Sequence, residues 1–180
     1  MRITSGNSDP KPEQLRVIQR ALHQLTDPQG ISGPELGLLS DSALIREVAA
    51  LLGMGDAPVW RSLAASRLVV AATSVLANDT CAKAQVAGQL LQAHYLRGAT
   101  LIDLARRAKR SSRTIDRWIL AAQKSLASFV FSLVEEAKRG ARGDDLLPPA
   151  LRAALAPTSN CTCRRNGVQS VPERSDAFDD

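Results

Sequence analysis

Aromatic residues are scarce in this 180-residue chain. Phe, Trp and Tyr together make up 3% of it, so a hydrophobic core must be built from aliphatic side chains. The abundance of Ala and Leu, with few runs of β-branched residues, favours helices over strands. Because 44% of the residues are hydrophobic, the chain can bury such a core. We therefore expect one medium-sized all-α domain, alone or with tails.

The chain also has few residues of the types that bind metals or form disulfides. A structural zinc site usually takes four ligands, with paired cysteines two to four residues apart. Cys161 and Cys163 are too close for that pattern, and His23 and His94 are remote and isolated. An odd number of cysteines without a signal peptide argues against a disulfide scaffold. We expect no metal, no cofactor and no disulfide framework.

Two further absences bear on location and activity. No apolar run approaches the ~18–20 residues that span a bilayer, and the longest candidate is interrupted by Arg67. The N-terminal residues have no apolar signal core, so we predict a cytoplasmic protein that does not bind membranes. A nucleophile motif, a nearby Cys–His pair and a glycine-rich phosphate loop are all missing from the sequence. We therefore predict that the chain is not an enzyme.

Apolar residues recur at three- and four-residue spacing, which predicts a multi-helix bundle. The expected helices are 12–25, 42–52, 59–76, 83–96, 101–108, 112–136 and 150–155. We group them into an N-terminal helical region (12–80), a second helical region (83–140) and a short helix with its linker (141–156). Residues 1–11 and 157–180 are polar, have little to bury, and are expected to be disordered.

Positive charge is concentrated in one segment. Residues 97–124 hold eight basic and two acidic residues, a net charge of +6, whereas the whole chain nets +5. The remainder of the chain therefore sums to about −1 by subtraction. A basic segment in an otherwise balanced chain is the electrostatic pattern expected of a nucleic-acid site.

The same segment has the pattern of a helix-turn-helix. Small Ala105 stands where a second helix would cross the first, and β-branched Ile115 comes ten positions later. Ser111 or Ser112 provides the hydroxyl that caps the second helix. The other positions expected to face inward are Leu101, Leu104, Ala108, Trp118 and Ile119. Residues 83–140 would thus contain a DNA-binding hairpin of two helices.

The polar residues of this hairpin fall into two groups. N-terminal residues of a recognition helix reach base edges in the major groove, and Arg binds guanine bidentately. The expected base-reading residues are Ser112, Arg113, Asp116 and Arg117. Basic side chains and helix-start N–H groups bind phosphates. The expected phosphate-binding residues are Arg106, Arg107, Lys109, Arg110, Ser111 and Lys124, with Gln123 also expected on the outward face.

Residues 86–134 resemble the region-4-type helix-turn-helix of bacterial sigma factors and of related phage late-gene regulators, including antitermination proteins. The resemblance covers about 50 of the 180 residues. It is carried by residues 90–100, 104–105, 111–117 and 121–126. It implies a transcriptional regulator that binds double-stranded DNA. The N-terminal helices would then dimerise, bind RNA polymerase or bind another partner.

The turn of the hairpin departs from the usual pattern. Glycine followed by an apolar residue is usual there, and this chain has Lys109 and Arg110. We expect Lys109 to take a left-handed conformation at a cost of about 1 kcal/mol. Either the turn is longer than usual or the motif is partly degenerate. The alternative function is therefore a helical adaptor, a signalling or assembly module whose helix-turn-helix binds protein.

Overall fold

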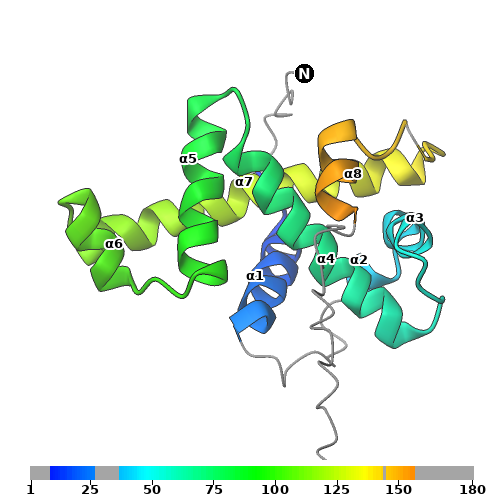
Figure 1. Ribbon diagram of the computed structural model, residues 1–180, viewed down its shortest axis with the longest axis horizontal. Helices are drawn as coiled ribbons and strands as arrows, with labels where there is room; N and C mark the ends of the chain where they lie inside the picture. Colours follow the sequence, from blue (N-terminus) through cyan, green and yellow to red (C-terminus); the bar gives the residue numbers. More distant parts are fainter. Residues whose placement is uncertain (1–8, 27–36, 144, 157–180) are drawn as a thin grey trace, which may run out of the picture.

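The computed structural model describes residues 9–26, 37–143 and 145–156. These residues form an all-helical fold, which confirms the predicted fold class (Figure 1). Disorder was predicted at 1–11 and 157–180, and these residues lie outside the described ranges except for 9–11, which lead into the first helix. In chain order the helices are α1 (Pro12–Thr26), α2 (Gly37–Ser40), α3 (Ala43–Leu51), α4 (Pro58–Ala77), α5 (Ala82–Leu91), the π-helical turn η3 (Gln92–Leu96), α6 (Leu101–Ala108), α7 (Ser112–Lys138) and α8 (Pro149–Leu155).

Two elements in this order were not predicted. The four-residue helix α2 is too short to give a periodic pattern in the sequence. The helix expected at 83–96 changes type at Gln92, where the backbone widens into the π-helical turn η3. Such a turn inserts an extra residue into the helix and redirects the chain beyond it. A short loop, residues 97–100, then connects η3 to α6.

Helix α4 is the centre of the bundle. It packs against α1, α2, α3, α5, α7 and α8, and its buried positions include Leu68, Val69 and Ala72. Among the described helices, α4 has the length and apolar composition that could cross a membrane. A helix at the centre of a bundle has the same composition, because it is covered on most of its sides.

One core joins the N-terminal helices to the later ones. The long helix α7 packs against α1, α3, α4 and α5, and its buried residues belong to the same apolar cluster as theirs. Figure 1 shows α7 running along the molecule, with α6 at one end and α3 and α8 toward the other. The first turns of α7 and the whole of α6 therefore form one end of the protein.

Helices α4 and α5 approach most closely at Gly88. A methyl group added there would lie 2.6 Å from both Ala77 Cα and Leu76 C, and closer still to the backbone nitrogen of Ala77. No side chain fits into this space without moving one helix. Gly88 thus fixes how α5 leaves α4, and with it the position of η3 and α6.

Candidate nucleic-acid interface

The chain enters α6 through a tightly bonded loop. Gly98 has a φ of 67°, and Ala99 N donates to Ala93 O at 2.9 Å. His94 Nδ1 lies 2.8 Å from Ala99 O. Because a carbonyl oxygen can only accept, His94 carries its proton on Nδ1 in this contact. These bonds hold the start of α6 against η3.

Thr100 and Asp103 cap the first turn of α6 reciprocally. Asp103 N donates to Thr100 Oγ1 at 3.1 Å, while Thr100 N donates to Asp103 Oδ2 at 3.3 Å. The Thr100 hydroxyl also donates to Asp103 Oδ2, at 2.7 Å. Bonds from the Thr100 hydroxyl and backbone hold the pKa of Asp103 below its usual value. This arrangement satisfies two N–H groups and caps the helix that the sequence predicts at 101–108.

Lys109 adopts the left-handed conformation that the sequence predicts, with φ 52° and ψ 46°. Lys109 N donates to Arg106 O at 3.3 Å, and Arg110 N donates to Ala105 O at 3.0 Å. These two bonds form a Schellman motif, in which glycine usually takes the left-handed position. Only residues 109–111 separate α6 from α7, so the turn is not lengthened. The structure accommodates Lys109 by backbone strain rather than by extra residues.

Helix α7 begins at a serine cap. Ser111 Oγ accepts from Thr114 N at 3.2 Å, and it lies 2.9 Å from Thr114 Oγ1. Ser111, not Ser112, is therefore the cap, and Ser112 is the first residue of α7. The cap leaves the Ser112 side chain exposed at the tip of the hairpin.

The inner face of the hairpin is narrower than predicted. Leu104, Ala105, Ile115 and Ile119 are buried and Leu101 is partly buried, as expected. Ala108 and Trp118 were expected on this face, but both are exposed, Trp118 at 43%. The eight residues of α6 cover only a strip of α7. Viewed down the axis of α7, Trp118 lies about 60° from Ile115 in one direction. Ile119 lies about 40° from Ile115 in the other direction. The covered strip therefore includes Ile119 and excludes Trp118.

The outward face of α7 carries a stripe of four side chains at four-, three- and four-residue spacing. These are Arg113, Arg117, Leu120 and Lys124, and we call them the α7 stripe. The first three are exposed, whereas Lys124 is partly buried. Asp116, beside the stripe, is also exposed, and so is Ser112 at the start of the helix. Of the residues predicted to read bases, Arg113, Asp116 and Arg117 thus lie on one side of α7, whereas Ser112 lies about 100° around the helix from Arg113.

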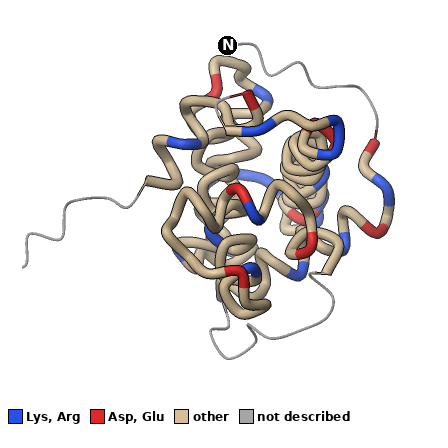
Figure 2. Tube along the Cα trace, turned by 90° about the vertical axis from the view of Figure 1, so that its right-hand side faces the viewer, with Lys and Arg blue, Asp and Glu red and all other residues tan. Residues whose placement is uncertain are grey.

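The predicted phosphate-binding side chains extend this surface onto α6 and the turn. Arg106, Arg107, Lys109, Arg110 and Ser111 are all exposed. Arg106 Nη1 lies 3.9 Å from Asp103 Oδ1, a distance that leaves the guanidinium able to turn outward. Lys124 lies about three turns into α7, apart from this group. Figure 2, which views the opposite end of the molecule, shows basic and acidic positions interspersed there.

A buried hydrogen-bond chain anchors α7 to η3 and α1 about three turns after the start of α7, and sequence reasoning missed it. Gln123 was expected to face outward, but it is buried: Gln123 Nε2 donates to Tyr95 Oη at 2.7 Å. Gln19 Nε2 donates to Gln123 Oε1 at 2.9 Å. The spacing from Ile115 and Ile119 to Gln123 places it on the apolar side of α7, which was the available signal.

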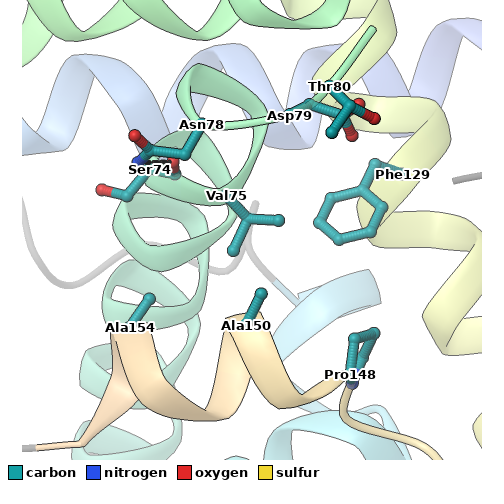
Figure 3. A pocket seen from close by; sticks show the side chains of 9 residues that line it. All are labelled: Ser74, Val75, Asn78, Asp79, Thr80, Phe129, Pro148, Ala150 and Ala154. Atoms are coloured by element: carbon teal, nitrogen blue, oxygen red, sulfur yellow. Dashed lines mark hydrogen bonds between the residues drawn. The ribbon is translucent and has the colours of Figure 1, made fainter. Parts of the chain in front are cut away.

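A separate hollow of about 290 Å³ lies between the end of α4, the middle of α7 and α8 (Figure 3). Val75, Phe129 and Ala150 give it apolar walls. On its polar rim, Asn78 Nδ2 donates to Ser74 O at 2.9 Å. Asp79 Oδ1 accepts from Cys81 N at 2.7 Å. These polar atoms serve the local backbone, so the hollow presents no convergent chemical groups.

Metal-binding side chains do not gather in the part of the chain that the structure describes. No group of three or more His, Cys, Asp or Glu side chains is placed there to hold an ion. No protein-family description, curated protein or solved structure matches this chain. A function must therefore be inferred from the geometry of the hairpin.

Proposed function

We propose that this protein binds double-stranded DNA in transcription control, with the first turns of α7 in the major groove. The observation that supports this most strongly is the position of Arg113 and Arg117. Both are exposed, one helical turn apart, on the face of α7 that is opposite the core. Among the exposed residues of α6 and the turn are four basic ones, Arg106, Arg107, Lys109 and Arg110, which are suited to phosphate contacts.

The chemistry of base reading depends on this position. The guanidinium groups of Arg113 and Arg117 can each donate two bonds to guanine O6 and N7. Their Cα atoms are about 6 Å apart along the helix axis, close to two base steps of about 3.4 Å. Asp116 beside them can accept a bond from the cytosine amino group. The proposed DNA site thus contains two guanines about two steps apart.

The second group of residues would hold the DNA backbone. Arg106, Arg107, Lys109 and Arg110 would contact phosphates by charge, and Ser111 by its hydroxyl. Lys124 would contact a phosphate farther along the groove. Contacts of this kind carry no sequence information, but they fix the orientation of the reading helix.

The rest of the molecule would then support the DNA-binding helices. The N-terminal helices would hold α7 and contact a second copy, RNA polymerase or another partner. We assign the protein no catalytic residue, cofactor, metal or membrane contact, and we propose a cytoplasmic location. The resemblance to sigma-factor region 4 is consistent with this assignment. The left-handed Lys109 keeps the turn at three residues despite its unusual sequence.

One observation favours the adaptor alternative. Ile102 and Trp118 are large apolar side chains of the same hairpin, and they are 64% and 43% exposed. Exposed apolar side chains can mark a protein interface where they form a patch. In that case the hairpin would bind a protein through these two residues, and Arg113 and Arg117 would contribute little.

A pair of matched double variants separates the two functions. Arg113→Ala with Arg117→Ala removes the two proposed guanine contacts. Arg46→Ala with Arg67→Ala removes the same charge from exposed positions on α3 and α4. We expect the first pair to weaken binding to a selected duplex by about 30-fold or more, since each bidentate contact is worth about 1–3 kcal/mol. Equal effects of the two pairs would contradict the proposal.

A further inference from the structure

Leu120 is the exception on the α7 stripe, because it is apolar among basic side chains. It is 43% exposed. It lies three residues after Arg117 and four before Lys124, so it points to the same side as both. The stripe therefore presents, from the start of α7, two arginines, one leucine and one lysine.

We infer that Leu120 recognises a thymine through the methyl group on its C5 atom. This inference rests on the proposed DNA binding. In the major groove, guanine, adenine and cytosine present hydrogen-bonding groups, and thymine adds an apolar methyl group. Leucine cannot donate or accept, so placing it against polar base edges would leave those groups without partners. Thymine is the base whose edge leucine matches.

The position of Leu120 relative to Arg117 locates this thymine. Three residues advance α7 by about 4.5 Å, slightly more than one base step of about 3.4 Å. The thymine therefore lies one or two steps beyond the guanine that Arg117 reads, on the side away from the guanine of Arg113. The proposed DNA site therefore contains two guanines followed closely by a thymine, which can lie on either strand.

DNA fits this stripe better than a protein partner does. A protein that covered Leu120 would also cover the cations of Arg117 and Lys124, whose side chains are exposed and partly exposed. Desolvating those charges is costly unless matching anions lie opposite them. DNA supplies phosphates beside the groove and a methyl group within it. The apolar Trp118 lies on the flank of α7, outside the stripe.

Deoxyuridine provides the test, because it differs from thymidine only by the methyl group. A duplex is first selected from a random pool with the full chain, and each thymine is then replaced in turn. One replacement should weaken binding about fourfold, the effect expected for one buried methyl group. Leu120→Ala should bind the thymine and deoxyuridine duplexes equally. Leu51→Ala is the control, because Leu51 is a leucine with 42% exposure near the other end of the molecule. This variant should still bind the thymine duplex more tightly than the deoxyuridine duplex.

The outcomes distinguish the inference from the function on which it rests. If no duplex is enriched, DNA binding itself is wrong and the inference is wrong with it. If a duplex is bound but no replacement matters, or if the fourfold effect remains in Leu120→Ala, only the inference is wrong. Leu120→Gln, a polar side chain of similar length, is a second variant. Leu120→Gln should also bind the thymine and deoxyuridine duplexes equally. Circular dichroism confirms that each variant is folded.

Discussion

The amide nitrogen of Gln123 donates a 2.7 Å hydrogen bond to the hydroxyl oxygen of Tyr95. This bond joins α7 to η3, and the bond from Gln19 to the same amide group joins both to α1. The Tyr95 ring meets the His23 and His94 rings edge-on, at centroid distances of 5.5 and 4.6 Å. Helix α7 is therefore held on its core side about three turns after its start, while its opposite face is left exposed.

Tyr95→Phe should destabilise the protein by about 1–2 kcal/mol, because it leaves the buried Gln123 amide without an acceptor. Adding Gln123→Leu should recover most of this loss, since both polar groups are then gone. Gln19 is only partly buried and can turn to water. Urea unfolding of the two single variants and the double variant measures the coupling. Additive losses would show that the bond does not link the two residues energetically.

Alkaline pH should destabilise the protein through Tyr95. Burial is the main cause that raises the pKa of Tyr95 above its usual value of 10.0. The folded state then keeps the phenol proton at a pH where the unfolded state has lost it. The contribution of the protonated Tyr95 to the free energy of unfolding is complete below about pH 10. It is lost as the pH rises through the pKa of Tyr95 in the folded state.

The single tyrosine of the chain makes this effect separable from lysine titration. Tyr95→Phe should unfold with a shallower dependence on pH above about 10 than the wild type does. Thermal unfolding followed by circular dichroism at several pH values gives the two curves. Parallel curves would mean that the phenol has the same pKa in both states.

Lys109→Gly should raise the free energy of unfolding by up to about 1 kcal/mol, because glycine takes the left-handed conformation without strain. Lys109→Ala keeps the strained φ of 52° and should give no such gain. Both variants lose one charge, so both should reduce the salt slope of DNA binding by about one. A gain in stability with alanine as large as with glycine would show that strain at Lys109 is not the cause.

Gly88→Ala should destabilise the fold by about 3 kcal/mol, because the added methyl group meets the backbone of Ala77 and Leu76. Gly55→Ala is the control, since its methyl group would reach Trp60 Cδ1 at an acceptable 3.4 Å. We expect the control to change stability by less than about 1 kcal/mol. Chemical unfolding compares the two, and similar values would contradict the close approach of α4 and α5.

Local signals predicted the hairpin well. Apolar spacing predicted α6 at 101–108, the serines at 111–112 marked the start of α7, and the missing glycine at Lys109 predicted a left-handed residue. All three depend on residues within a few positions of each other. They are therefore readable from the sequence alone.

The side chains placed wrongly depend on distant parts of the chain. Gln123 is buried because Gln19 and Tyr95 from other elements lie over it, and Trp118 is exposed because it lies outside the strip of α7 that α6 covers. The π-helical turn at Gln92–Leu96 likewise depends on packing rather than on a local motif. Whether a given face of a helix is buried can be predicted from the sequence only when the element that packs against that face is known.

The central claim is tested most directly by the salt dependence of binding to duplex DNA. The full chain is titrated against random and selected duplexes at about 50 and 200 mM salt. Five basic phosphate contacts predict a slope of log affinity against log salt of about −4.5, and thus a loss of about 500-fold between the two concentrations. A binding constant that does not change with salt, or no binding at about 50 mM, would contradict the account.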